Sequence, residues 1–549
     1  MLSIICFALC ITFALTTSSP SPPIIVSTSL GDISGVELTS RLGESFKAFL
    51  GIRYAQNPVG ELRFTNPKPV EPWKPELFNA TIDGPRCPQS PLNSPDNSED
   101  CLRLNVYSKD LNQNKSSPVI VFIHPGGFYG SSGRIVSAGP QLLMDRNVVL
   151  VTINYRLGTL GFLATGTADA PGNAGLKDQV FALRWVRDHI HNFGGNPNSV
   201  TLLGYSAGSR STGLHMVSPM SRGLFHRAIA MSGSPIQLVK YTDDQLNLVR
   251  KQAKLLKCPS DSTKDIIKCL KEAPFEDFVK TFDNMFEIGY HPMLNWSPVI
   301  EKDFGQERFL TEDPLTSFEK GNFQKTPMII GRTKDEFARI AYYNLQNENI
   351  TEQMNKHWNE IAPIMLNYDR NSSASKEIST LLRVAYQVDN KVIANSTPFE
   401  PFEKLLSDAI IGFPVYRLVN LLEKHIPVYY YCFTYKGRYS DFKYPGDSAY
   451  GAVHHDDLLY LLHIPRIAPL FSKTDPENKI VERITRMWTQ FAETGNPNNS
   501  KDEYLKNLNW KPYNIESENY LDIGDELLMD EQLFVRRLAT WEIILGEIS

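Results

Sequence analysis

The chain has 549 residues, of which 42% are hydrophobic and 21% are charged, as is ordinary for a globular protein. Its formal net charge of −5 excludes the strongly basic balance of most nucleic-acid-binding proteins, so no nucleic-acid partner is expected. We find no internal repeat and no low-complexity tract.

Residues 2–15 form an apolar run that is too short to span a bilayer. Small and polar residues follow, which favours a cleaved secretory signal, although no Lys or Arg precedes the run. A membrane anchor is the alternative. No later segment is apolar and long enough to span, and residues 545–549 resemble neither a retention signal nor a lipid-anchor tail. We therefore expect residues 1–18 to be removed and the mature protein to be soluble, secreted and extracellular.

The spacing of apolar residues predicts strands that alternate with helices. Before about residue 118 the chain reads as short strands and loops rich in Pro and Gly. Strands are predicted at 118–123, 148–154, 200–203, 228–234, 328–331 and 428–435. Helices are predicted at 176–192, 210–217 and 481–493, and residues 241–320 read as mainly helical. The alternation predicts an α/β fold with a largely parallel sheet, helices on both faces and insertions over its carboxyl edge.

The strand at 200–203 leads directly into Gly204-Tyr205-Ser206-Ala207-Gly208, which has the pattern G-x-S-x-G. In a strand-to-helix elbow this pattern presents a serine hydroxyl from a tight turn, and the flanking residues are glycine because β-carbons would not fit. The pattern alone is a weak signal. Because a predicted strand precedes it and a predicted helix follows it, we expect Ser206 to be a nucleophile rather than a helix-capping serine.

Residues 193–208 resemble the active-serine signature of the type-B carboxylesterase/cholinesterase family, and residues 99–106 resemble its second signature. Shorter matches lie at 51–55, 154–158 and 491–497, so the resemblance extends from about residue 30 to the C-terminus. It implies an α/β hydrolase of the secreted insect carboxylesterase type, with residues 19–549 as a single domain. It also implies a small-molecule ester substrate and neither a metal nor an organic cofactor.

A serine hydroxyl needs a general base to become a good nucleophile, and a carboxylate usually holds that base. In α/β hydrolases the order along the chain is serine, acid, histidine. His454 fits the family pattern G-x-x-H-x-x-D/E that starts at Gly451, whereas His455 breaks this spacing. We expect His454 to be the base; a surface histidine pair beside two aspartates is the alternative reading.

The acid is expected after the strand that ends at Gly331. Residues 331–337 resemble the family's Lys-Asp-Glu turn, in which the second carboxylate belongs to the triad. The resemblance assigns this role to Glu336 and leaves Asp335 as the alternative. Without the serine and the histidine, both would read as solvated loop residues.

The tetrahedral intermediate of ester hydrolysis carries an oxyanion that preorganised N–H donors stabilise. The resemblance assigns this role to the backbone N–H groups of Gly126, Gly127 and Ala207. The two glycines follow the strand at 118–123 and can pass close to a substrate because they have no side chain. Pro125 stands where the family usually has glycine, but its missing N–H is not one of the three donors.

Departures from the family pattern narrow the range of substrates that we expect. Neutral Tyr205 precedes the nucleophile where many members have glutamate, and the short loop between Cys87 and Cys101 contains no tryptophan. A quaternary ammonium then has no obvious cation–π host, so we do not expect a choline esterase. Tyr205, Leu294 and Trp296 are predicted to line the substrate pocket, where Leu294 would limit the size of the acyl group; a position in the core is the alternative for Leu294 and Trp296.

Three classes of function remain. We expect hydrolysis of uncharged carboxylic esters, and the juvenile hormone esterases, which share most of these motifs but carry glutamine before the nucleophile, are an alternative within that class. A slow stoichiometric ester scavenger is the second class. A catalytically inactive adhesion module is the third, although such modules typically lack triad residues and this chain does not. The physiological ester and the oligomeric state are left open.

Cysteines and sequons agree with an oxidising compartment. The family pairs the positions that match Cys87 with Cys101 and Cys258 with Cys269, whereas Cys432 lies in an apolar run and is expected to stay free. The resemblance also implies two buried ion pairs, Arg63 with Glu99 and Arg156 with Asp178. Glycans are expected at six of seven sequons, namely Asn79, Asn114, Asn349, Asn371, Asn395 and Asn498. The seventh, Asn295, lies in the predicted pocket wall just before Pro298 and is expected to stay empty.

Overall fold

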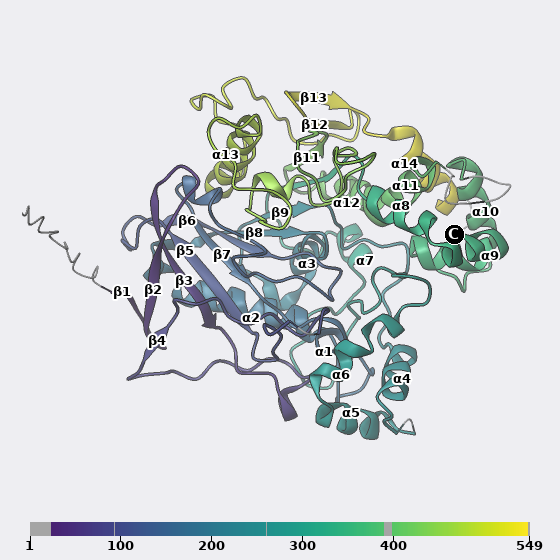
Figure 1. Ribbon diagram of the computed structural model, residues 1–549, viewed down its shortest axis with the longest axis horizontal. Coiled ribbons are helices and arrows are strands. Elements are labelled where there is room, and N and C mark those ends of the chain that lie inside the picture. The colour runs from purple at the N-terminus through teal and green to yellow at the C-terminus, as the bar shows by residue number, and fades with distance from the viewer. Residues whose placement is uncertain (1–22, 93, 260, 389–392, 394–397, 547–549) are drawn as a thin grey trace, which may run out of the picture.

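The computed structural model describes residues 23–92, 94–259, 261–388, 393 and 398–546, so the predicted signal lies outside the described residues. Within these residues thirteen strands form one sheet, in the order β1-β2-β3-β5-β7-β6-β8-β9-β10-β11-β12-β13, with β4 paired to β2. The strands are β1 (Ile24–Thr28), β2 (Gly31–Thr39), β3 (Ser45–Arg53), β4 (Leu77–Asn79), β5 (Arg103–Ser108), β6 (Ser117–Ile123), β7 (Val149–Ile153), β8 (Gly195–Tyr205), β9 (Arg227–Met231), β10 (Met328–Thr333), β11 (Val428–Phe433), β12 (Asn519–Ile523) and β13 (Leu527–Glu531). Figure 1 shows the N-terminal strands in purple at one end of the sheet and the β12–β13 hairpin in yellow at the other.

The centre of the sheet is parallel. From β7 through β6, β8, β9, β10 and β11 to β12 every neighbouring pair is parallel. The pairs at both ends, from β1 to β3, from β3 through β5 to β7, and from β12 to β13, are antiparallel. The central strands read as continuous aliphatic runs because both of their faces are buried, as in other parallel sheets covered on two sides.

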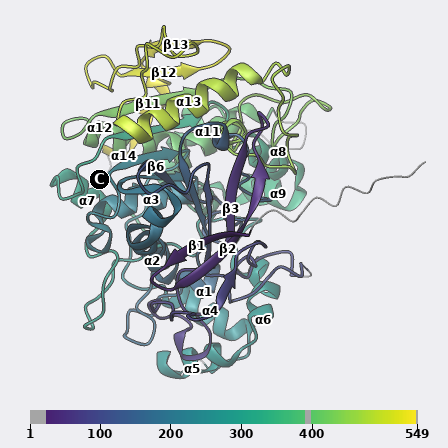
Figure 2. The ribbon, with the colours of Figure 1, turned by 90° about the vertical axis from the view of Figure 1, so that its left-hand side faces the viewer.

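Helices cover both faces of the sheet. The α-helices are α1 (Gly158–Phe162), α2 (Ala174–His189), α3 (Ala207–Val217), α4 (Leu246–Leu255), α5 (Thr263–Glu272), α6 (Phe275–Lys280), α7 (Pro314–Glu319), α8 (Ala338–Gln346), α9 (Glu348–Leu366), α10 (Ser375–Ala385), α11 (Glu400–Ser407), α12 (Phe413–Leu422), α13 (Asn478–Thr494) and α14 (Val535–Gly546). Shorter 3-10 helices span Gly60–Leu62, Leu143–Asp145, Ile190–Phe193, Pro219–Ser221, Phe282–Met285 and Leu458–Tyr460, and a π-helical turn spans Asp408–Gly412. Figures 1 and 2 show α13 beside the sheet near β11 and α4–α6 in one group away from the sheet. Another group consists of α8–α11, and α14 packs against α10 of this group.

Alternate residues of the central strands enter two separate cores, because successive side chains of a strand point to opposite faces. Val121 and Leu202 belong to the core that also holds Leu214 of α3. Phe122 and Leu203 belong to the other core, which holds Trp488 of α13. This second core also contains Ile120, Ile229, Ile329, Ile484 and Met487. The sheet is therefore sandwiched between α2 and α3 on one side and α13 on the other.

The strand and the helix on either side of Ser206 are longer than predicted. β8 begins five residues before the predicted strand because Gly195 pairs with Ser117 of β6. Helix α3 begins at Ala207, directly after Ser206, rather than at residue 210. Within residues 241–259 and 261–320 the structure has only the short helices α4–α7 and a 3-10 turn, with loops between them, so the prediction of a mainly helical segment was wrong in extent.

One helical stretch among the described residues, Glu400–Leu422, is long and apolar enough to be considered as a membrane span. Of its most apolar 18 residues, 78% are buried inside the protein, as expected of a core helix.

Candidate active site

The predicted site residues follow the carboxyl ends of neighbouring parallel strands. Ser206 comes directly after β8, and the loop with Gly126 and Gly127 comes directly after β6. Glu336 lies in the turn after β10, and His454 lies in the long connection after β11. Since β6, β8, β9, β10 and β11 are consecutive neighbours in the sheet, their carboxyl ends share one edge. This edge is where open α/β sheets bind their ligands.

Ser206 lies in a strained turn between β8 and α3. Its φ of 56° and ψ of −114° are unusual for a residue with a side chain. A β-carbon on Gly204 would lie 2.0 Å from the carbonyl oxygen of Gly208, and one on Gly208 would lie 2.0 Å from that of Ile123. Both glycines are therefore required by the close approach of β8, α3 and β6. The backbone N–H of Ser206 donates a hydrogen bond of 2.8 Å to the carbonyl of Met231 at the end of β9. This bond ties the turn to the neighbouring strand.

His454 and Glu336 are in direct contact. Nδ1 of His454 lies 2.5 Å from Oε2 of Glu336, and the backbone N–H of His454 donates to the Glu336 carbonyl at 3.0 Å. The other carboxylate oxygen of Glu336 accepts the backbone N–H of Thr333 at 2.9 Å. Burial acts to raise the pKa of Glu336, but the charge and hydrogen bond of His454, together with the charge of Arg332, leave this pKa lowered. The carboxylate is thus held ionised beside the imidazole.

Asp335, the alternative acid, is used elsewhere. Its carboxylate accepts the backbone N–H of Ala452 at 3.2 Å, and its own N–H donates to the Ala452 carbonyl. Burial raises the pKa of Asp335. The geometry therefore places Glu336, and not Asp335, against His454. Among the described residues no hydrogen bond engages Nε2 of His454 or the hydroxyl of Ser206.

The loop after β6 carries three of the features expected of an oxyanion hole. Gly126 and Gly127 have φ values of 110° and 60°, and a β-carbon on Gly126 would lie 2.1 Å from the carbonyl oxygen of Gly130. No described residue accepts a hydrogen bond from the backbone N–H of Gly126, Gly127 or Ala207. Ala207 is buried, whereas Gly126 and Gly127 are partly buried, and the three donors lie in the two turns that follow the neighbouring strands β6 and β8. N–H groups without a protein acceptor at one edge of the sheet are available to an anion or a polar ligand.

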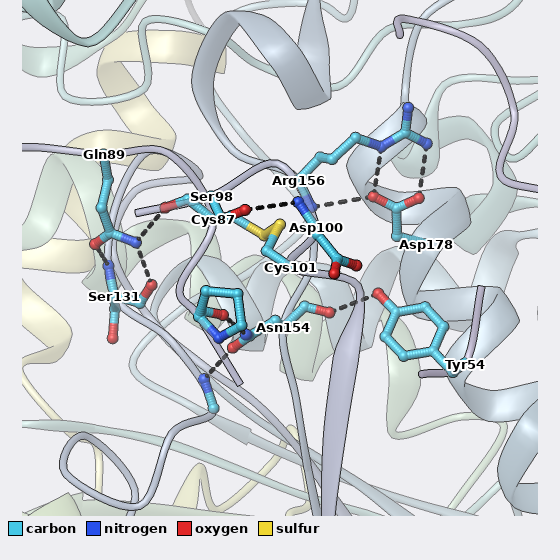
Figure 3. The surroundings of a disulfide bond; sticks show 12 residues. Tyr54, Cys87, Gln89, Ser98, Asp100, Cys101, Ser131, Asn154, Arg156 and Asp178 are labelled. Atoms are coloured by element: carbon cyan, nitrogen blue, oxygen red, sulfur yellow. Dashed lines mark hydrogen bonds and ion pairs between the residues drawn. A yellow bond between two sulfur atoms is a disulfide. The ribbon is translucent and has the colours of Figure 1, made fainter. Parts of the chain in front are cut away.

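A disulfide-closed loop supports the segment that follows Gly126 and Gly127. Cys87 is joined to Cys101, and within the loop Gln89 forms a reciprocal pair with Ser131, at 2.8 Å to its carbonyl and 2.7 Å from its N–H. Figure 3 shows this pair beside the disulfide, with the bidentate ion pair between Arg156 and Asp178 nearby. The second disulfide joins Cys258 to Cys269, and Cys432 is free and buried. Arg63 and Glu99 form the other expected pair, at 2.8 Å and 2.5 Å.

Tyr205 is not a pocket residue, which corrects its predicted role. Its side chain belongs to the core on the α13 side of the sheet and is fully buried, because Tyr205 lies two residues after Leu203 on β8 and therefore on the same face of the sheet. Its hydroxyl is engaged by protein groups, donating to Asp457 at 2.9 Å and accepting the N–H of His455 at 2.7 Å.

The structure places Leu294 and Trp296, of the predicted pocket wall, in different surroundings. Trp296 is almost fully buried and packs in the core on the α2 and α3 side. Leu294 is half-buried and lines a cavity of about 880 Å³ bounded by α4 and the loops at 237–245 and 285–298. None of the residues lining that cavity belongs to the predicted triad or to the loop after β6. The structure therefore gives no support to Leu294 as the limit on the acyl group.

The sequons fall into three groups. Asn79, Asn114, Asn349 and Asn371 are exposed, whereas Asn395 lies outside the described residues. Asn295 is only 6% exposed and its Nδ2 atom is buried. Asn498 donates from Nδ2 to Asn496 Oδ1 at 2.8 Å and to the Trp510 carbonyl at 2.9 Å, so both amide hydrogens are used. A glycan would replace one of them, which argues against the predicted modification of Asn498.

Two residues beside the site were missed. Ser232, directly after β9, has a φ of 55° and its hydroxyl interacts with Glu336, which lowers the pKa of that acid. Asp457 accepts the hydroxyls of Tyr205 and Tyr431, and burial raises the pKa of Asp457 to about 6. The position of Ser232 after a buried strand could have signalled it, since that strand is a neighbour of β8. Asp457 is the last residue of the G-x-x-H-x-x-D/E pattern that starts at Gly451, so the pattern marked its position but not its contacts.

A sheet in this order, with a G-x-S-x-G elbow at the end of its central strand, defines an α/β hydrolase. Residues 22–541 match the model of the carboxylesterase family. The chain belongs to the carboxylesterase family and is a carboxylic ester hydrolase.

Several relatives are insect enzymes. The chain is 36% identical over 540 residues to "Juvenile hormone esterase" of Tribolium castaneum, covering 93% of this chain and 89% of the relative. It is 34% identical over 505 residues to "Esterase FE4" of Myzus persicae, covering 89% and 87%. The solved structure of juvenile hormone esterase from Manduca sexta, with OTFP covalently attached, superimposes with a TM-score of 0.84 at 28% identity, covering 96% of this chain and 100% of that chain.

Proposed function

We propose that this carboxylesterase hydrolyses uncharged carboxylic esters through an acyl-enzyme on Ser206, with His454 as the general base and Glu336 as the acid of the triad. The contact between His454 Nδ1 and Glu336 Oε2 at 2.5 Å carries the proposal, because it fixes the tautomer that leaves Nε2 to accept a proton. Neither that nitrogen nor the Ser206 hydroxyl forms a hydrogen bond in the described part of the chain, so both are available to the reaction.

The reaction has two halves. His454 takes the proton of Ser206 as its oxygen attacks the ester carbonyl, and the N–H groups of Gly126, Gly127 and Ala207 receive the oxyanion. The protonated imidazole then gives its proton to the leaving alcohol, and the acyl group stays on Ser206. A water molecule, deprotonated by His454, releases the acid by the same steps in reverse. No step needs a metal ion, and the described residues contain no cluster of three or more metal-ligating side chains.

The substrate class rests on what surrounds the nucleophile. Tyr205 is neutral and buried, so the site lacks the carboxylate that many relatives place before the serine. We therefore propose neutral esters and a secreted, extracellular protein of one domain (19–549), which the two disulfides and a relative named "Venom carboxylesterase-6" of Apis mellifera support. The 36% identity to "Juvenile hormone esterase" favours a second candidate, hydrolysis of juvenile hormone.

The test compares purified wild type and Ser206→Ala on a series of neutral esters of increasing acyl length and on juvenile hormone. We expect multiple turnovers by the wild type and a loss of at least about 10⁴-fold in kcat for the variant. A single burst without turnover would indicate a stoichiometric scavenger. A kcat/KM for juvenile hormone far above that for every other ester would favour the second candidate. Near-normal hydrolysis by a folded Ser206→Ala protein would contradict the mechanism.

A further inference from the structure

Tyr205 connects the strand that carries the nucleophile to the loop that carries the base. It is the last residue of β8 and is fully buried, although its hydroxyl is polar. The hydroxyl accepts the backbone N–H of His455 at 2.7 Å and donates to Oδ1 of Asp457 at 2.9 Å. A third contact, with Oγ of Ser232, is longer at 3.3 Å. The side chain of Tyr205, next to Ser206, thus holds both His455 and Asp457 in the segment that follows His454.

His455 is a residue that needs such support. Its φ is 85°, a conformation that residues with a side chain rarely adopt and that persists only where the surroundings impose it. The ring of His455 stacks on the ring of Tyr205 with centroids 5.0 Å apart and planes 24° apart. The edge of the Tyr205 ring also meets the ring of His454 at 5.2 Å. Tyr205 therefore contacts the strained residue through its backbone and its ring, and touches the base as well.

We propose that Tyr205 is a positioning residue for catalysis: by holding the N–H of His455 and packing against His454, it keeps the imidazole of His454 aligned between Glu336 and Ser206. The inference rests on the proposed function, in which His454 is the base. It assigns to Tyr205 an effect on the chemical step and not on substrate binding, because the side chain is buried away from the surface of the site.

Tyr431 on β11 is the matched control. It too is fully buried, and its hydroxyl donates to the other carboxylate oxygen of Asp457 at 2.9 Å. No hydrogen bond links Tyr431 to the backbone of residues 453–456 within the described ranges. Tyr205→Phe and Tyr431→Phe each remove one hydroxyl from the same carboxylate, but only Tyr205→Phe releases the N–H of His455.

The experiment measures kcat, KM and thermal midpoint for Tyr205→Phe, Tyr431→Phe and the wild type, with kcat expressed per active site titrated by the acylation burst. We expect Tyr205→Phe to lower kcat about tenfold or more with KM within about twofold, since misplaced catalytic groups cost rate rather than affinity. Tyr431→Phe is expected to keep kcat within about twofold, with a similar fall in thermal midpoint. Equal kcat values in the two variants, or an effect of Tyr205→Phe on KM alone, would overturn the inference.

The double variant Tyr205→Phe/His455→Gly supplies a second test that remains usable if Tyr205→Phe alone folds poorly. Glycine adopts a φ of 85° without steric cost, so the turn after His454 needs less support. We expect the double variant to fold and to exceed Tyr205→Phe in kcat per titrated site, or to give measurable kcat where the single variant yields no protein. A double variant with kcat no higher than a folded single variant, or one that folds without measurable kcat, would contradict the role of the strained turn.

Ser206→Ala is assayed in parallel. Near-normal turnover by this variant would remove the proposed function itself. An inactive Ser206→Ala, together with equal kcat values for Tyr205→Phe and Tyr431→Phe, would remove only this inference.

Discussion

At the scale of single residues, Glu336 and Asp335 are neighbours with different tasks. Glu336 contacts His454 at 2.5 Å, whereas Asp335 accepts the N–H of Ala452. We expect Glu336→Gln to lower kcat/KM by about 10³–10⁴, because a neutral amide neither stabilises the protonated imidazole nor selects its tautomer. Asp335→Asn is the control and is expected to stay within about tenfold of the wild type. Steady-state kinetics on folded protein decides, and equal losses in both variants would contradict the assignment of the acid.

Asp457 gives a residue-scale prediction on stability. Burial raises the pKa of Asp457 to about 6, so the folded state favours the protonated carboxyl. This contribution to stability is present below the unfolded pKa, near 4, and is lost as pH rises through about 6, at a cost on the order of 2–3 kcal/mol. The thermal midpoint of Asp457→Asn should therefore rise relative to the wild type between pH 5 and pH 8. A difference in thermal midpoint between the two proteins that stays constant over this pH range would refute a raised pKa for the buried carboxyl of Asp457.

At the scale of elements, the loop after β6 is where backbone geometry matters most. A β-carbon at Gly126 would lie 2.1 Å from the Gly130 carbonyl at a φ of 110°, whereas one at Gly130 would lie 3.7 Å or more from any neighbour outside its adjacent residues. Gly126→Ala should displace the donors and lower kcat by about 10²-fold or more, as loss of one oxyanion donor does elsewhere. Gly130→Ala should keep kcat within a few fold. The pair is compared by kcat and thermal midpoint, and similar kcat values would argue against this loop as the oxyanion hole.

At the scale of the whole molecule, the sequons predict a pattern of modification. Asn79, Asn114, Asn349 and Asn371 are exposed and should carry glycans when the chain is secreted from eukaryotic cells. Asn295 and Asn498 should not, since the amide of the first is buried and that of the second is bonded within the protein. Intact-glycopeptide mass spectrometry reads each site separately. High occupancy at Asn498 would mean that its contacts with Trp510 form after, or do not survive, modification.

Much of the fold and the site could be predicted because the signals are local. A strand, a glycine on each side of Ser206 and a following helix lie within a few residues of one another, and their sterics leave one arrangement. The predicted pocket role of Tyr205 was wrong because the face of β8 on which it lies depends on the register of β8 against β6 and β9. A single sequence does not give that register. The predicted pocket role of Leu294 was not supported for a related reason: packing between α4 and distant segments determines the positions of the loops that form the walls of a pocket. Asp457 completes the G-x-x-H-x-x-D/E pattern that starts at Gly451, but its role depends on the hydroxyls of Tyr205 and Tyr431, which come from distant strands.

The most direct test of the central claim is to identify where the acyl group is held. Wild-type protein is treated with a fluorophosphonate or a slowly released acyl donor, digested and mapped by mass spectrometry, beside Ser206→Ala. We predict stoichiometric labelling on the peptide that contains Ser206, with loss of activity in proportion to labelling, and no label on that peptide in the variant. Complete inactivation of the wild type with the label on any other residue, or full activity of a protein labelled at Ser206, would contradict the account.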